Sequence, residues 1–315
     1  MNIRKAAILG CGYVGAASAF ALMNSGLFSE LVLLDLDRTR AEGEALDIGH
    51  GLPFARPMKI YAGDYADLSD AAVIIVTAGA GQKPGETRLD LAKKNVGVFR
   101  DIMPKIAAVN RDAILLIVSN PVDVLTYAAV RLSGYPEHRV FGTGTVLDTA
   151  RLKYLLGRRL SVDPRSVHAF ILGEHGDSEI PAWSCANVSG IPLREFCRMR
   201  GVPVEPGTLD ALAEDVKNSA YAIIEKKQAT YYGIAMTVRR ICEAIVRDEK
   251  SVLPISCVQH GLSGLEDVAL SLPAIVGKNG VETTVPLALS EQERDALRKS
   301  AATLRNVLRS TLDPE

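Results

Sequence analysis

The sequence predicts an α/β fold, with a doubly wound parallel sheet in the first half and an α+β arrangement in the second. Three observations lead to this prediction. Short apolar runs alternate with helix-compatible stretches through the first half, a glycine motif follows the first run, and the alternation becomes irregular after about residue 143. Apolar runs without polar alternation are typical of strands buried on both faces of a parallel sheet.

The predicted strands of the first half are rich in Val, Ile and Leu and are bounded by Gly, Asp, Asn or Pro: residues 6–9, 31–34, 73–77 and 113–119. Residues 14–25 form a helical pattern that ends at Gly26, and a sixth strand is expected near residues 140–142. Strands that alternate with helices in this way favour a doubly wound sheet.

The second half is predicted from weaker patterns. Residues 148–160 are expected to be helical, 167–172 to form a strand, and about 209–248 to form a long helical region broken near Gly233. Two more strands are expected at 252–258 and 268–276. A capping box at residues 290–293 opens a C-terminal helix whose apolar face holds Leu297, Ala301, Leu304 and Leu308. We therefore divide the chain into domains at 1–143 and 144–315.

Composition excludes several classes of protein. The 315 residues carry a formal net charge of −1, so neither nucleic acid nor an anionic membrane is an expected partner. The five cysteines are odd in number and no pair has CxxC spacing, which leaves a disulfide framework or a metal site unsupported. Residues 6–22 are as apolar as a signal peptide, but their glycine spacing favours a strand, a turn and a helix. We expect a soluble, cytoplasmic protein with reduced thiols.

A glycine motif of the form GxGxxG lies between the first strand and the first helix, with Gly10, Gly12 and Gly15 at its fixed positions. In this context the motif predicts a Rossmann dinucleotide site, because the helix N-terminus stabilises a pyrophosphate. Asp35 ends the second strand, 20 residues after Gly15, and can accept hydrogen bonds from ribose hydroxyls, which favours NAD over NADP. The alternative is an ordinary strand-end or capping aspartate. Arg40 is interpreted as a solvated residue near the adenosine edge.

Three further segments carry residues suited to catalysis. Residues 173–177 place His175 between glycines after an apolar strand, and Asp148 and Arg151 lie three residues apart on a predicted helix. Residues 79–88 form a loop with three glycines and a proline, at the edge of the sheet where ligands bind. Each segment also has an ordinary interpretation. His175 could be a structural histidine, Asp148 and Arg151 an intrahelical ion pair, and residues 79–88 a surface connection.

Together these segments resemble the lactate/malate dehydrogenase family over nearly the whole chain. The resemblance rests on the glycine motif, Asp35, and residues 82–88, 119–123, 148–151, 173–177 and 229–233. It implies an NAD-dependent enzyme that transfers hydride reversibly between NADH and pyruvate, which gives L-lactate.

The resemblance also assigns roles to the polar residues. His175 would be the proton donor and acceptor, and Asp148 would bond its other ring nitrogen. Arg151 would hold the substrate carboxylate with a two-pronged fork. Arg88, on a mobile loop at about 79–91, would polarise the substrate carbonyl.

Other residues are assigned to the substrate or the cofactor. Asn120 would bond the substrate or the nicotinamide ribose, Thr230 would line the substrate pocket, and Ile234 would pack on the nicotinamide. Asn120 could equally form a strand-end turn, and Thr230 and Ile234 could equally pack between helices. The remaining expected cofactor contacts are Val14, Tyr65, Gly79, Ala80, Val118 and Thr143.

Substrate choice is predicted from Gln82, which occupies the position where malate-specific members carry arginine. A neutral glutamine suits the methyl group of pyruvate and offers no partner for a second carboxylate. Three alternatives stay open: a dehydrogenase of larger, branched 2-hydroxy acids, a malate dehydrogenase, and a non-catalytic NAD-binding module. The last predicts loss of a catalytic residue, yet all four are present.

Assembly and regulation follow from the resemblance alone. Family members form tetramers, so a homotetramer is expected. Many bacterial members bind fructose 1,6-bisphosphate at a subunit interface through an arginine and a histidine, and the matching positions here are Lys153 and His168. Because lysine offers no bidentate fork, weak activation or none is predicted. Both residues could also be ordinary surface residues.

Overall fold

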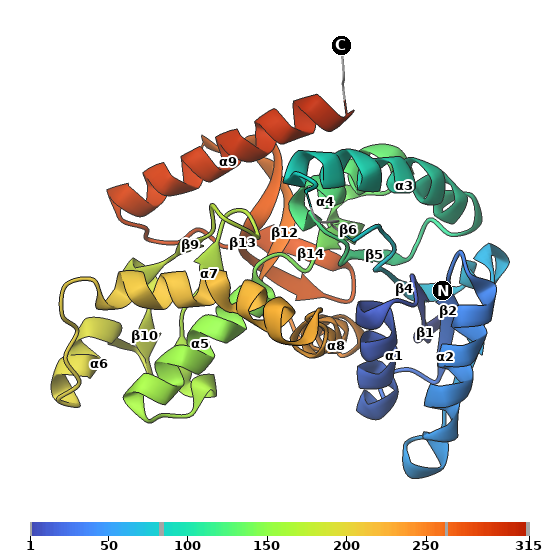
Figure 1. The fold of residues 1–315 in the computed structure, drawn as a ribbon, viewed down its shortest axis with the longest axis horizontal. Coiled ribbons are helices and arrows are strands. Elements are labelled where there is room, and N and C mark those ends of the chain that lie inside the picture. The colour runs from blue at the N-terminus through green and yellow to red at the C-terminus, as the bar shows by residue number, and fades with distance from the viewer. Residues whose placement is uncertain (1, 82–84, 262–263, 313–315) are drawn as a thin grey trace.

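One sheet runs through the molecule (Figure 1). The computed structural model describes residues 2–81, 85–261 and 264–312. Within these residues, nine strands form a sheet in the order β14-β13-β12-β6-β5-β4-β1-β2-β3. Its parallel part consists of β1 (Asn2–Leu9), β2 (Glu30–Leu34), β3 (Lys59–Ala62), β4 (Ala71–Val76), β5 (Ile114–Ile117) and β6 (Val140–Gly142). The order 3-2-1-4-5-6 is that of the doubly wound dinucleotide-binding fold.

Both faces of the parallel sheet are covered by helices, and alternate residues of each strand point to opposite faces. In β4, Ile74 and Val76 join one apolar cluster, and Val73 and Ile75 join another. The first cluster contains residues of α3 (Arg88–Val109), α4 (Val122–Ser133) and α9 (Glu291–Leu312). The second contains residues of α1 (Tyr13–Ser25), α2 (Arg38–His50) and α8 (Tyr232–Val246). This double cover explains why the strands read as continuous apolar runs.

Antiparallel strands of the second half extend the same sheet. They are β12 (Ser251–His260), β13 (Glu266–Gly277) and β14 (Gly280–Thr284). β12 joins the parallel part through β6, where Ser256 pairs with Gly142. We keep the division into domains 1–143 and 144–315 as a proposal, with β6 and β12 as the shared edge.

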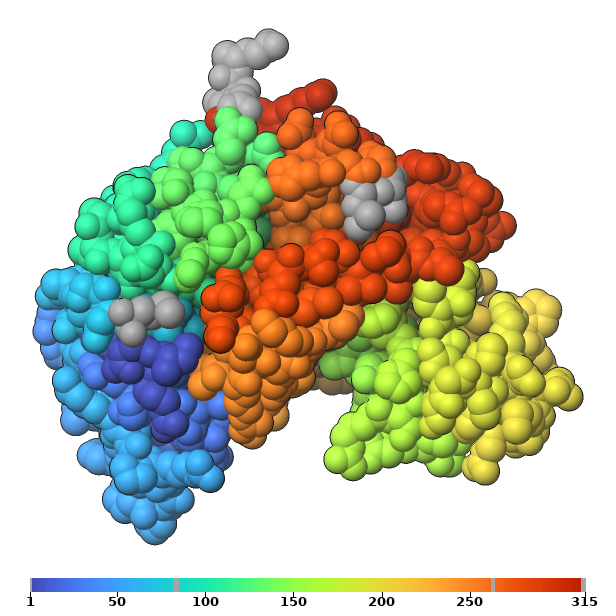
Figure 2. Space-filling model, turned by 180° about the vertical axis from the view of Figure 1, so that it is seen from behind, coloured from blue at the N-terminus to red at the C-terminus, as the bar shows by residue number. Residues whose placement is uncertain are grey.

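A smaller lobe projects from this sheet, coloured green to yellow in Figures 1 and 2. It contains α5 (Val146–Leu160), α6 (Leu193–Met199) and α7 (Thr208–Lys227) around a third apolar cluster. Two small sheets lie beside them, one with β7 (Val167–His168), β10 (Asn187–Val188) and β11 (Ile191–Pro192), the other with β8 (Ile171–Leu172) and β9 (Ile180–Pro181).

The predicted elements mostly recur, with two corrections. The single strand at 167–172 is wrong: β7 and β8 belong to different sheets, because the N–H and C=O of Ile171 bond to the hydroxyls of Thr149 and Thr145 on and beside α5. The long helical region breaks at Gln228, whose φ is 70°, and Gly233 instead lies in the first turn of α8. The short 3₁₀ helices, helix α6 and the strands β3, β9, β10, β11 and β14 were not predicted.

Several local predictions hold. Helix α1 ends at Gly26, which adopts a left-handed φ of 65°. The Ser290 N–H donates to Glu293 Oε2 at 2.8 Å, and the Glu293 N–H donates to Ser290 Oγ at 3.3 Å, which forms the expected capping box. In the described part of the chain, every helix is too short or too polar to cross a membrane.

Candidate active site

The glycine loop is shaped by close backbone contacts. Gly10 has a φ of 98°, and a Cβ there would lie 2.6–2.9 Å from the backbone of Thr77 and Ala78. A Cβ on Gly15 would overlap the carbonyl oxygen of Gly10. Around Gly12, by contrast, a Cβ would have no atom within 4 Å among the described residues. Gly10 and Gly15 are therefore needed for the turn, whereas Gly12 leaves open space where a ligand can approach.

The N-terminus of α1 suits an anion. The helix begins after Gly12 without a side-chain cap, and no acidic residue lies in its first turn. The first N–H groups of a helix lack partners within the helix, and the helix dipole adds partial positive charge there. Open space at Gly12 and these N–H groups fit the pyrophosphate of a dinucleotide.

Asp35 lies beside the glycine loop. Its carboxylate accepts hydrogen bonds from the N–H of Cys11 at 2.5 Å and of Asp37 at 3.0 Å. Arg40 is exposed on α2 and borders a surface pocket of about 390 Å³ that Tyr13 and Tyr231 also line. Asp35 is thus held against the glycine loop, and Arg40 lies on the outer surface.

The ends of β4, β5 and β6 carry other predicted cofactor residues. The N–H of Val118 donates to the carbonyl of Val76, and the N–H of Thr143 donates to the carbonyl of Ile117, both at 2.9 Å. These bonds align the carboxyl ends of the strands, where open α/β sheets bind ligands. Val14 lies in the first turn of α1, whereas Tyr65 packs near α3, with Lys105 Nζ 5.7 Å from its ring centre.

Asn95, which was not predicted from the sequence, joins the segments that contain Ala80 and Asn120. This buried residue of α3 accepts from the N–H of Ala80 at 2.7 Å and donates to the carbonyls of Ala80 at 3.2 Å and Asn120 at 2.7 Å. Its side chain also lies against Gly79. A buried asparagine on an apolar helix face is the signal that could have revealed it.

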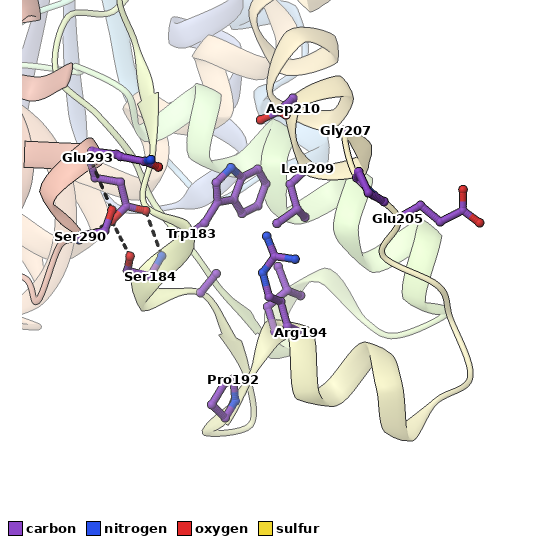
Figure 3. A pocket seen from close by; sticks show the side chains of 14 residues that line it. Trp183, Ser184, Pro192, Arg194, Glu205, Gly207, Leu209, Asp210, Ser290 and Glu293 are labelled. Carbon is purple, nitrogen blue, oxygen red and sulfur yellow. Dashed lines mark hydrogen bonds between the residues drawn. The ribbon is translucent and has the colours of Figure 1, made fainter. Parts of the chain in front are cut away.

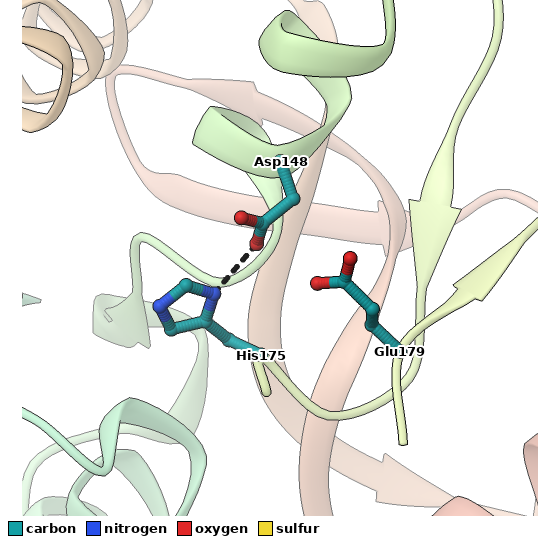
Figure 4. A group of neighbouring side chains, drawn as sticks. All are labelled: Asp148, His175 and Glu179. Carbon is teal, nitrogen blue, oxygen red and sulfur yellow. Dashed lines mark hydrogen bonds and ion pairs between the residues drawn. The ribbon is translucent and has the colours of Figure 1, made fainter. Parts of the chain in front are cut away.

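His175 lies at the centre of a polar cluster (Figure 4). Its Nδ1 is 2.6 Å from Asp148 Oδ2, and Asp148 Oδ1 accepts a hydrogen bond from Arg151 Nη1 at 2.7 Å. The Asp148 side chain is only 2% exposed. The backbone N–H of His175 donates to Asp123 Oδ2 at 2.7 Å, so α4 and α5 both fix the histidine.

The electrostatics of this cluster favour an imidazolium. Burial lowers the pKa of His175, but the Asp148 carboxylate more than offsets burial and raises that pKa to about 9. Burial alone would raise the pKa of Asp148, yet His175 and Arg151 hold it below its ordinary value. The two residues therefore form a charged pair at neutral pH.

Arg88 approaches the same loop from the start of α3. Its Nη2 donates to Asp177 Oδ1 at 2.9 Å and to the Tyr221 hydroxyl at 2.6 Å. Its Nη1 lies against Gly176, where a Cβ would be only 2.7 Å away. Tyr221 lies on α7 and was not predicted, because nothing in the sequence joins it to a residue 133 positions earlier.

The remaining predicted substrate residues lie near the start of α8. Gly233 packs on the side chain of Leu147, next to Asp148, which brings this turn to the His175 cluster. Thr230 is half-buried just before α8, and Ile234 packs into the second apolar cluster. Gln82 lies outside the described residues.

Lys153 is half-buried on α5 with a pKa lowered by burial, and His168 is exposed on β7, which α5 contacts. A pocket of about 500 Å³ near Trp183, Arg194 and Leu209 contains none of the predicted site residues (Figure 3).

Possible metal ligands are Asp148, His175 and Glu179, whose ligand atoms lie within 4.8 Å of one another. Asp148 already bonds His175 and Arg151, so we interpret the group as an acid–base cluster. That the protein uses no metal stays a prediction.

Comparisons with known proteins agree with this site. The model for the lactate/malate dehydrogenase NAD binding domain matches residues 4–142, and the model for the α/β C-terminal domain of the same family matches residues 145–313. An L-lactate dehydrogenase of Acetivibrio thermocellus is 50% identical over 311 residues, which cover 99% of this chain and 98% of the relative. One of Thermoanaerobacterium saccharolyticum is 51% identical over 305 residues, which cover 97% and 98%.

Solved structures give the same result. The minor L-lactate dehydrogenase of Enterococcus mundtii superposes with a TM-score of 0.95 at 45% identity, and 99% of each chain is covered. A lactate dehydrogenase from a Medee basin deep-sea metagenome library gives the same values. The predicted α/β fold and the predicted family are confirmed. Because both domain models of the family match the chain and full-length relatives are similar to it, the chain belongs to the lactate/malate dehydrogenase family.

Proposed function

We propose that the protein is an NAD-dependent L-lactate dehydrogenase that interconverts pyruvate and L-lactate. The observation that carries this proposal is the Arg151–Asp148–His175 cluster, which combines a proton donor with a carboxylate-binding cation. Reduction of a 2-keto acid needs both, because the substrate carries a carboxylate and its keto oxygen must receive a proton. The full-length similarity to L-lactate dehydrogenases supports the same reaction.

The cofactor would bind along the carboxyl ends of the strands. Gly10, Gly12 and Gly15 with the N-terminus of α1 would hold the pyrophosphate, and Asp35 would accept from the ribose hydroxyls. When bound, the cofactor supplies the hydride for pyruvate or accepts it from lactate. Because Asp35 would repel a 2′-phosphate, we expect NADH to be preferred to NADPH.

His175 would move the proton through Nε2. Its Nδ1 is held by Asp148, so Nε2 is the nitrogen left to face the substrate oxygen. With a pKa of about 9, the ring is protonated at neutral pH and can donate during pyruvate reduction. In lactate oxidation, the neutral ring would take the hydroxyl proton at the same atom, and Asp148 would stabilise the resulting imidazolium.

The two arginines would hold the substrate. Asp148 accepts from one nitrogen of Arg151, and further N–H groups of this guanidinium would form a fork on the substrate carboxylate. Arg88 would exchange part of its bonding to Asp177 and Tyr221 for the keto oxygen, where negative charge develops. Asn120 and Thr230 would complete the pocket.

Substrate choice follows from charge. Gln82 would leave a second carboxylate unpaired, which disfavours oxaloacetate and favours pyruvate. A panel of pyruvate, oxaloacetate, 2-oxobutyrate and 2-oxoisocaproate, each with NADH and with NADPH, tests this proposal through kcat/KM. We expect the highest value for pyruvate with NADH. A higher value for 2-oxoisocaproate or oxaloacetate would assign the chain to a different substrate, and the absence of turnover would support a non-catalytic module.

Assembly, location and regulation are proposed from the family. We expect a homotetramer in the cytoplasm, which sedimentation and fractionation can check. Fructose 1,6-bisphosphate should activate weakly or not at all, because Lys153 replaces the arginine that would form a fork on a phosphate. Strong activation at micromolar effector, abolished by Lys153→Ala, would contradict this expectation.

A further inference from the structure

The carboxyl group of Glu179 lies beside the Asp148–His175 pair (Figure 4). It lies four residues after His175, where the chain turns back so that the Glu179 N–H donates to the Gly176 carbonyl at 3.2 Å. One ligand atom each of Asp148, His175 and Glu179 lies within 4.8 Å of the others. Glu179 Oε1 is buried and has no hydrogen-bond partner among the described residues.

A carboxyl group with one buried oxygen that lacks a hydrogen-bond partner is costly as an anion, and it acts on its neighbours mainly through its electric field. Burial and the nearby Asp148 charge raise the pKa of Glu179 to about 8, although His175 and the cations Arg151 and Lys217 lower it. Glu179 is therefore a neutral acid near pH 7. It ionises in the range just below the pKa of about 9 at which His175 loses its proton.

The other charged groups around His175 come from several elements. Asp148 and Arg151 lie on α5, and Asp123 at the start of α4 accepts from the His175 N–H. Burial raises the pKa of Asp123 to about 7, although the Ser256 hydroxyl and His175 oppose this. Lys217 of α7 acts on Glu179, although no hydrogen bond joins the two in the described structure.

The remaining charged groups on the loop already have partners. Arg88 and Asp177 pair with each other, and Glu174 accepts a hydrogen bond from the Ser178 hydroxyl. Glu179 is thus the carboxyl group of this loop whose charge is left to act on His175.

We propose that Glu179 is a positioning residue for the proton of His175: its ionisation holds the imidazolium in place and extends pyruvate reduction to higher pH. This inference rests on the proposed function. At neutral pH the uncharged acid adds no second negative charge when His175 gives its proton to the keto oxygen. As the pH rises, the Glu179 carboxylate appears beside the ring and opposes loss of that proton.

The sign of the effect can be tested with Glu179→Gln, which keeps the size of the side chain and removes its ionisation. Without the carboxylate, the pKa of His175 should fall by roughly one unit, as expected for a charge a few ångströms away. Loss of pyruvate reduction at high pH and gain of lactate oxidation should both move to lower pH by the same amount. Turnover of pyruvate at pH 6 should stay within about threefold of wild type, because Glu179 is neutral there.

Histidine NMR gives a readout that does not depend on catalysis. The chain has five histidines, so His175→Asn can assign the His175 signal, and its titration can be followed in the tetramer without substrate. Glu179→Asp keeps a carboxyl group and should retain at least part of the high-pH range. Glu214→Gln removes one exposed carboxylate, 3.9 Å from Lys217, and should leave the titration unchanged.

The outcomes separate the inference from the proposed function. A lower His175 pKa in Glu179→Gln, together with the shifted pH profiles, supports it. An unchanged His175 titration, or a loss of activity that is uniform across pH, overturns it. If Glu179→Gln does not fold, Glu179→Ala removes the same carboxyl group, and an unchanged His175 titration in that variant also overturns it. Failure of wild type to reduce pyruvate would refute the proposed function, while the NMR titration would still decide whether Glu179 acts on His175.

Discussion

The glycine loop and the His175 cluster are built in opposite ways. The loop comes from consecutive residues, Gly10 to Gly15, and offers backbone N–H groups and open space. The cluster draws side chains from α3, α4, α5 and the loop after β8, and it depends on charge. The first site should therefore be damaged by added atoms, and the second by altered charges. If the two sites are independent, each change should affect one function and spare the other.

The largest expected effect is a change of substrate by Gln82→Arg. An added arginine would pair the second carboxylate of oxaloacetate and would leave its own charge unpaired with pyruvate. A combined change of roughly 4–7 kcal/mol corresponds to about 10³–10⁵ in the ratio of kcat/KM values. Kinetics with both keto acids measure this ratio, and NADH affinity should stay constant. A ratio that moves less than about tenfold would mean that residue 82 does not meet the substrate side chain.

The next effect is loss of the proton donor. His175→Ala should reduce turnover by about 10²–10⁴, the usual span for a general acid–base residue. NADH binding, followed by fluorescence, should barely change, because the glycine loop is separate from the cluster. Near-normal turnover would remove His175 from the proposed mechanism, and a large loss of NADH affinity would show that the two sites are coupled.

Charge within the cluster can be tested through pH. His175 must be protonated for pyruvate reduction, so wild-type reduction should fall as the pH rises through about 9, and lactate oxidation should rise. Asp148→Asn removes the carboxylate that contributes most to the raised pKa of His175, so this pKa should fall towards its ordinary value of 6.5. Reduction at pH 7.5 should fall by up to roughly tenfold. A profile that keeps its wild-type midpoint would show that Asp148 does not control His175.

The same contrast explains what the sequence could predict. The parallel strands were recognisable because burial on both faces leaves only apolar residues, as in β4, where all six are buried. The edge strand β3 has no fully buried residue, so its pattern carried no such signal. The glycine motif was recognisable because its geometry is local.

The catalytic role of the His175 cluster could be predicted only through the family resemblance. Asp123 and Tyr221 reach His175 and Arg88 through the tertiary fold, and no periodicity in the sequence joins them. The strand expected at 167–172 was wrong for the same kind of reason, because threonines near α5 bind the backbone of Ile171. Local patterns report burial, whereas these contacts depend on how distant elements pack.

The smallest effect on turnover is expected from two matched changes in the glycine loop. In Gly15→Ala the new methyl would overlap the Gly10 carbonyl and approach Thr77 Oγ1, so the backbone must shift. Overpacking of this kind costs about 1–3 kcal/mol of unfolding free energy. In Gly12→Ala the methyl would meet no described atom within 4 Å, so stability should change by less than about 0.5 kcal/mol. The methyl would instead occupy the space proposed for the pyrophosphate, and NADH should bind several-fold more weakly.

Urea unfolding and NADH titration of both variants separate the two effects. In each variant the pH dependence of turnover at saturating NADH should match wild type, since neither methyl lies near His175. Equal stability losses in the two variants, or unchanged NADH affinity in Gly12→Ala, would contradict the roles given to these glycines.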